Sequence, residues 1–177
     1  MPQINKMMSI GSFGLVAGFS ALSDDWRWRY LHYNAVAQTP APRGSTLRVS
    51  RHPNAYFHFG VAISRIEPQA NCLAITTTKD RRLETDFIIL GTGFDTDPMK
   101  QPVMDGYADN ILQWRDCYTP PPGLENEGLA LFPYLNRNFS FKERDVGKTP
   151  WLERIHCFNY GSKMSLGNIS GDIPAVS

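Results

Sequence analysis

The distribution of apolar and polar residues before residue 91 predicts a series of strands. Residues 56–69 are rich in aromatic and β-branched side chains, and residues 72–80 contain three consecutive threonines, so both segments favour extended structure. The sequence Glu-Pro-Gln-Ala-Asn between them is typical of a turn. We therefore predict an antiparallel pair of strands at about Val61–Glu67 and Leu73–Thr78.

A continuous apolar run, Phe87–Leu90, follows between Asp86 and Gly91. Runs of this length are typical of a strand that is covered on both faces, as in a parallel sheet. The pattern therefore predicts an α/β fold in which a small antiparallel β-meander leads into a buried strand of a parallel sheet.

The apolar run ends in Gly91, Thr92 and Gly93. Because glycine has no Cβ, the chain can turn sharply here and another molecule can approach the backbone closely. In open α/β sheets, ligands bind beyond the carboxyl ends of the strands, where this turn is expected. A tight turn without a ligand explains the same residues, because a single Gly-x-Gly is a weak signal.

The end of the chain, residues 154–177, contains a second candidate ligand site. Ile155–Phe158 is expected to be a strand, and a loop rich in glycine, serine and asparagine follows it. Asp172 then favours the start of a helix that has Pro174 in its first turn. Free N–H groups at a helix N-terminus favour an electronegative ligand. An ordinary capped helix would carry the same residues.

The order of these segments resembles the flavin-dependent monooxygenases and related FAD/NAD(P)-dependent oxidoreductases, flavoproteins with two dinucleotide-binding domains. In that family a meander precedes a buried strand that ends in Ala-Thr-Gly or Gly-Thr-Gly, often before an aromatic residue, as in Asp86–Phe94. A Gly/Ser loop that leads into a helix beside the flavin resembles Gly161–Ser177. A basic segment with a His-Pro-Asn turn resembles Arg48–Gly60. The resemblance covers about residues 26–177.

The resemblance implies a partial Rossmann-like FAD/NAD(P)-binding fold, with FAD and NAD(P)H as cofactors. Residues 1–95 would be the C-terminal part of an NAD(P)H-binding domain, and residues 96–177 the C-terminal part of an FAD-binding domain. In this interpretation the Thr92 hydroxyl could donate a hydrogen bond. Cofactor-binding roles fall on Gly91, Thr92, Gly93, Phe94, Gly171, Asp172 and Ile173.

The chemistry that the resemblance implies belongs to the cofactors. NAD(P)H passes hydride to FAD, and the reduced flavin either reacts with O₂ to oxygenate a substrate or passes electrons onward. The protein positions the cofactors and excludes water. The sequence contains no evident acid–base pair or nucleophile triad, so we assign no catalytic residue.

The chain departs from the family because it lacks both of the glycine-rich sequences, called glycine fingerprints, that bind the cofactor pyrophosphates. Gly-x-Gly-x-x-Gly or a close variant normally binds each pyrophosphate, but no glycine stands three residues after Gly93, and Gly11–Gly18 has a different spacing. We therefore interpret the chain as part of a flavin-dependent NAD(P)H oxidoreductase that lacks the N-terminal FAD half. We predict that it does not turn over NAD(P)H alone. The alternative is a non-catalytic remnant or interaction module that does not bind FAD.

The amino-acid composition is compatible with this interpretation. The net charge of +1 gives no reason to expect nucleic-acid binding, and 42% apolar residues permit a core. Cys72, Cys117 and Cys157 lie far apart without a C-x-x-C motif, and the histidines lack metal-ligand spacing. Neither a dithiol site nor a metal site is expected, and the cysteine usage favours a reducing compartment.

The segment 6–25 contains a lysine, an apolar run and small residues, like a weak signal peptide. The run is too short and too rich in glycine for a transmembrane helix. We favour a packed helix with Gly11, Gly14 and Gly18 on one face, because the residues that follow continue directly into the family resemblance. We therefore expect a cytoplasmic protein. The sequence indicates neither a particular small-molecule substrate nor an oligomeric state.

Overall fold

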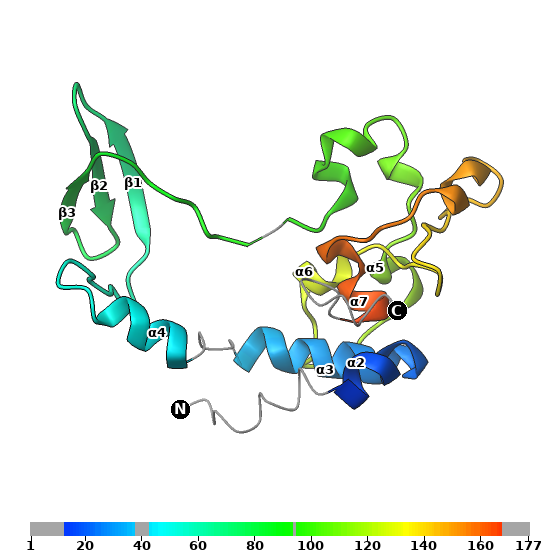
Figure 1. Cartoon of the computed structure of the whole chain (residues 1–177). Coiled ribbons are helices and arrows are strands. Elements are labelled where there is room, and N and C mark those ends of the chain that lie inside the picture. The colour runs from blue at the N-terminus through cyan, green and yellow to red at the C-terminus, as the bar shows by residue number, and fades with distance from the viewer. Residues whose placement is uncertain (1–12, 38–42, 94, 168–177) are drawn as a thin grey trace. The chain divides into compact units, whose positions relative to one another are not determined.

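The computed structural model describes residues 13–37, 43–93 and 95–167, which are divided between two compact units (Figure 1). Unit 1 combines residues 1–40 with residues 94–177, and unit 2 spans residues 41–93. Unit 2 therefore interrupts unit 1 in the sequence.

Unit 2 contains helix α4 (Arg43–Ser50) and a three-stranded antiparallel sheet in the order β1-β2-β3. Its strands are β1 (Ile63–Pro68), β2 (Leu73–Thr77) and β3 (Arg82–Thr85). The central strand, β2, pairs with both of its neighbours. The antiparallel pair predicted from the sequence is confirmed.

The predicted parallel strand and the Rossmann-like parallel sheet are wrong. Phe87–Leu90 has no regular structure, and the sheet formed by the described residues is antiparallel throughout. The side chains of Phe87, Ile89 and Leu90 are 74%, 90% and 72% exposed. A strand needs a neighbour for its N–H and C=O groups, and no described strand pairs with this run. The apolar pattern indicates that these side chains favour burial, but it does not identify a neighbouring strand that could pair with them.

Unit 1 is built from short helices, 3-10 turns and loops. Its longest described helix is α3, which contacts α6 and α7 (Figure 1). Isolated β-bridges, rather than a sheet, connect the loops between residues 111 and 156. The described α-helices of this unit are α2 (Phe13–Gly18), α3 (Asp24–Ala37), α5 (Trp114–Cys117), α6 (Glu127–Ala130) and α7 (Lys163–Leu166).

The sequence at the start of α3 explains why a helix begins there. The Ser23 hydroxyl accepts a hydrogen bond from the backbone N–H of Trp26, which is a typical N-cap contact. Asp24 and Asp25 lie in the first turn, where negative charge interacts favourably with the helix dipole. Asp25 also pairs with Arg29 one turn later at 2.8 Å.

The buried face of α3 forms the first core cluster of unit 1. Trp28 and Leu31 are almost fully buried and belong to one cluster with Trp114, Phe132 and Met164. The indole Nε1 of Trp28 donates a 2.8 Å hydrogen bond to the carbonyl of Leu124. This contact satisfies the polar end of a buried aromatic side chain, so the helix and the loop before α6 are fixed together.

A second core cluster lies among the loops of unit 1. Ile111, Leu135, Phe141, Leu152 and Cys157 are buried together.

The strand predicted at Ile155–Phe158 is wrong, because only an isolated bridge between Ser140 and His156 is present. Phe139, on the partner segment, has a φ of +68°, which interrupts its extended conformation.

Candidate functional site

The glycine turn predicted to contact a cofactor lies at the end of unit 2. Gly91, Thr92 and Gly93 are exposed and irregular, and Gly93 has a φ of +92°. A Cβ added at either glycine would meet nothing within 4 Å. Their cofactor role stays a prediction. Four other predicted residues lie outside the described residues, and their roles also stay predictions: Phe94, Gly171, Asp172 and Ile173.

The structure contains a cavity of about 290 Å³ within unit 1. Its walls come from three parts of the chain: the segment that begins two residues after Gly93, the loop around Pro133 and Phe141, and the segment that leads into α7. The lining residues are Asp95, Thr96, Pro98, Gln101, Met104, Pro133, Phe141, Cys157, Phe158, Asn159, Tyr160 and Gly161. This set combines an apolar surface with a few side-chain amides and one carboxylate, a composition typical of small-molecule sites.

The first wall is shaped by two aspartates around a 3-10 turn, Pro98–Lys100. Asp97 caps the turn by accepting a hydrogen bond from the N–H of Met99 at 3.0 Å, and it also accepts one from Gln113 Nε2 at 3.2 Å. Asp95 accepts a 2.9 Å hydrogen bond from Lys100 Nζ. This bond, with a further one from the N–H of Asp97, holds the pKa of Asp95 below its usual value. Asp95 is therefore a paired anion at neutral pH.

Another part of the lining is shaped by Asn159, which caps the 3-10 turn Tyr160–Ser162. Its Oδ1 accepts hydrogen bonds from the N–H of Gly161 at 2.9 Å and from the thiol of Cys157 at 3.2 Å. Burial raises the pKa of Cys157, so its sulfur stays protonated at neutral pH. The thiol is thus a poor nucleophile, because the thiolate is the reactive form.

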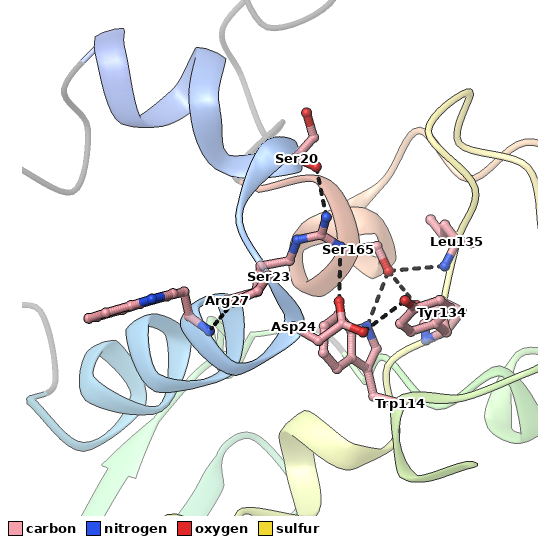
Figure 2. A network of polar contacts seen from close by, with 10 residues as sticks. Ser20, Ser23, Asp24, Arg27, Trp114, Tyr134, Leu135 and Ser165 are labelled. Atoms are coloured by element: carbon pink, nitrogen blue, oxygen red, sulfur yellow. Dashed lines mark hydrogen bonds and ion pairs between the residues drawn. The ribbon is translucent and has the colours of Figure 1, made fainter. Parts of the chain in front are cut away.

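A polar network supports the wall at Pro133 (Figure 2). The buried hydroxyl of Ser165 donates to the Pro133 carbonyl at 3.1 Å and accepts from Trp114 Nε1 at 3.1 Å and from the Leu135 N–H at 3.0 Å. Beside it, the Tyr134 hydroxyl donates a 2.9 Å hydrogen bond to Asp24. The network connects α3, α7 and the loop that lines the cavity.

Sequence reasoning missed the polar residues of the cavity because their signal is local. Asn159, two residues before Gly161, is typical of a capped turn, and so is Asp97, which caps the turn next to the lining. Such patterns predict turns but not which turns face one another. Gln101 has no local signal, and only the folded chain shows that it lines the same cavity as Asn159.

The described residues do not by themselves fit a whole FAD. The cavity lies at the lower end of the range of about 300–1,000 Å³ for sites that hold drug-sized ligands. The sequence also lacks the Gly-x-Gly-x-x-Gly turn that would bind the pyrophosphate. Among the described residues, no cluster of histidine, cysteine and acidic side chains is suited to a metal ion. No described helix has the length and apolar character needed to cross a membrane.

Comparison with known proteins finds a distant relative among the flavoproteins. No family model matches the chain, and no solved structure matches it. The chain is 25% identical, over 167 residues, to the FAD-dependent urate hydroxylase of Xanthomonas campestris pv. campestris. The alignment covers 94% of this chain and 35% of the relative, so the chain spans about a third of that protein's length. The similarity is therefore to one part of an FAD-dependent enzyme.

Proposed function

We propose that the chain is part of an FAD-dependent monooxygenase that uses NAD(P)H as the hydride donor. The observation that carries the proposal is the similarity to an FAD-dependent urate hydroxylase over 94% of this chain. The order of the meander, the Gly-Thr-Gly turn and the C-terminal Gly/Ser loop supports the same class. Bound FAD would supply the redox chemistry, and the protein would position the reactants.

In this proposal, the cavity of unit 1 is a small-molecule site, and the FAD pyrophosphate is bound by residues other than those described. The cavity has the mixture of apolar and polar groups that such sites need, and it offers no nucleophile–base pair of its own. Residues 1–95 and 96–177 keep the roles expected from the sequence, as C-terminal parts of the NAD(P)H-binding and FAD-binding domains. Gly91–Phe94 and Gly171–Ile173 are the proposed backbone contacts to the cofactors.

A flavin titration of the purified full chain tests the proposal. We expect saturable quenching of flavin fluorescence, with similar affinity for riboflavin, FMN and FAD, because the chain lacks the turn that would recognise the pyrophosphate. Thr92→Val should weaken this quenching, whereas the matched change at exposed Thr119 should not. NADPH with added FAD should be oxidised no faster than in buffer with FAD alone. Steady enzymatic oxidation would contradict that expectation.

The second candidate function is a non-catalytic remnant or an interaction module. It is favoured by one observation, the absence of both glycine fingerprints from the sequence. A colourless chain that quenches none of the three flavins would support this alternative and would rule out a flavin-contacting role for the described residues.

A further inference from the structure

Strand β1 lies at one edge of the sheet in unit 2, and its outer side has no backbone partner among the described residues (Figure 1). All six of its residues are exposed, and they include two large apolar side chains, Ile63 and Ile66. An edge strand presents backbone N–H and C=O groups with which another strand can pair. This edge is therefore a candidate surface for strand addition.

The alternation of hydrogen bonds in the β1–β2 ladder identifies the backbone groups that face outward. The N–H of Gln69 donates to the carbonyl of Cys72 at 2.8 Å. Opposite residues of an antiparallel ladder alternate between hydrogen-bonded and non-hydrogen-bonded pairs, so Arg65 and Glu67 are hydrogen-bonded to β2 and Ile66 is not. The N–H and C=O of Ile66 therefore point away from β2, toward the free edge.

The side chains on either side of Ile66 carry opposite charges. Arg65 and Glu67 lie on the same face of the strand, because they are two positions apart, and they form an exposed ion pair at 2.8 Å. When a second copy of β1 is paired antiparallel about Ile66, Arg65 of each chain lies opposite Glu67 of the other. The charge pattern is thus complementary to itself in this register.

The backbone geometry favours the same register. The N–H of Ile66 in each chain donates to the carbonyl of Ile66 in the other, which makes a hydrogen-bonded pair. Arg65 and Glu67 then form non-hydrogen-bonded pairs, whose Cα atoms are about 4.5 Å apart and whose side chains come closest. On the other face, the row of Ile66, Ile75 and Leu83 continues into the same row of the second copy.

We propose that β1 is a homodimer interface, in which two chains pair antiparallel about Ile66 and join their three-stranded sheets into one. The inference goes beyond the proposed function and depends only on unit 2. The competing explanation is that Pro68 and the two charges protect the edge from pairing. Pro68 lacks an N–H, but it lies outside the Ile66 pair and the two charge pairs, so it limits the length of the interface and leaves these contacts possible.

The other edge strand, β3, has a similar charge pattern but a less suitable geometry. The N–H of Thr77 donates to the carbonyl of Arg81 at 3.0 Å, so Arg82 and Glu84 are the positions whose backbone groups face outward. A second copy paired there would place these charges in hydrogen-bonded pairs, whose Cα atoms are about 5.5 Å apart, farther than across β1. β3 therefore provides the matched control for β1.

The test is analytical ultracentrifugation of the full chain at concentrations up to about 1 mM. We expect a monomer–dimer equilibrium with a Kd on the order of 0.1 mM, because the interface is small. Arg65→Glu places like charges opposite each other and should weaken dimerisation about tenfold, and addition of Glu67→Arg should restore it. Arg82→Glu, alone and with Glu84→Arg, makes the same changes on β3 and should leave the dimer unaffected.

Two further measurements separate the register from the folding of each variant. The melting temperature of Arg65→Glu should stay near that of the wild type, because the ion pair that it breaks within the chain is exposed. Hydrogen exchange should show the Ile66 amide unprotected at low concentration and protected as the dimer forms, whereas the Glu67 amide is protected in both states.

Four outcomes would overturn the inference. A chain that is monomeric at about 1 mM would show that Pro68 and the charges protect the edge. A dimer that Arg65→Glu does not weaken, or that the added Glu67→Arg does not restore, would exclude this register. A dimer that is weakened by Arg82→Glu instead would assign the interface to β3.

Discussion

Unit 1 buries several of its aromatic side chains, whereas the aromatic side chains of unit 2 are exposed. In unit 1, the indoles of Trp28 and Trp114 are almost fully buried, and each has a hydrogen-bond partner for its N–H. In unit 2, Phe59, Phe87 and Ile89 are 80%, 74% and 90% exposed. Apolar character alone therefore does not determine burial in this chain. The buried tryptophans are those whose neighbours also satisfy their polar atoms.

The largest effect is expected from Trp114→Ala in unit 1. The side chain is fully buried among the first core cluster, so its removal leaves a cavity and deprives the Ser165 hydroxyl of a donor. We expect the free energy of unfolding of unit 1 to fall by about 3–5 kcal/mol, measured by urea denaturation. Trp26→Ala is the control, because Trp26 is 63% exposed, and it should change stability by less than about 0.5 kcal/mol. Similar losses for both variants would contradict the role given to burial.

Tyr134→Phe should have a smaller effect, and one that depends on pH. It removes the hydrogen bond to Asp24, and we expect a loss of about 1–2 kcal/mol near pH 7. Burial, and then the hydrogen bond to Asp24, raise the pKa of Tyr134 from its ordinary value of 10.0 to about 12. The folded state therefore holds this proton more tightly than the unfolded state. The stabilisation is complete below pH 10 and is lost as the pH rises from 10 to 12.

Denaturation of both proteins at several pH values from about 8 to about 11.5 checks this prediction. The difference between wild type and Tyr134→Phe should be constant up to about pH 10 and should then shrink. A difference that stays constant to the highest pH would show that the hydroxyl does not titrate with folding.

The third prediction compares the two glycines of the turn in unit 2, Gly91 and Gly93. Gly93 has a φ of +92°, whereas Gly91 does not have a positive φ, and a Cβ added at either position would meet open space. Gly93→Ala should therefore destabilise unit 2 by about 1 kcal/mol through backbone strain, and Gly93→Val by more. Gly91→Ala should be neutral or slightly stabilising. Melting curves that follow signals from unit 2 measure the stability of each variant. Equal changes in stability at both positions would argue against backbone strain as the cause.

The smallest effect is expected from Ile89→Ser in unit 2. Because the side chain is 90% exposed, its loss should change the free energy of unfolding by less than about 0.5 kcal/mol. A destabilisation above about 1 kcal/mol would mean that the run Phe87–Leu90 is buried in solution, as the sequence pattern predicted. Urea denaturation of the full chain measures the difference.

The parts of the fold that the sequence predicted correctly depend on neighbours along the chain. The β1–β2 pair follows from extended segments joined by one turn, and its partners are close in sequence. Phe87–Leu90 was predicted wrongly because a parallel strand depends on a partner far away in the chain, and the apolar pattern carries no information about that partner. The strand at Ile155–Phe158 was predicted wrongly because the positive φ of Phe139 has no signature in the sequence.

The candidate site was less predictable than the fold. Sequence reasoning emphasised Gly91 and Gly93, whose function stays a prediction. The cavity instead has a lining that includes Gln101 and Asn159, which are 58 positions apart in the sequence. Only the folded chain shows that these two residues line the same cavity.

The insertion of unit 2 between the two parts of unit 1 has a consequence for the order of events during synthesis. The partners of α3 arrive late, because Trp28 bonds to a residue 96 positions away, and Asp24 to one 110 positions away. Pairing in the meander spans far shorter loops and can form as soon as residue 85 has emerged from the ribosome. We expect the meander to gain hydrogen-exchange protection first in pulse labelling. Until residues 114–134 have also emerged, the indole of Trp28 remains without its partners, and a chaperone can bind it.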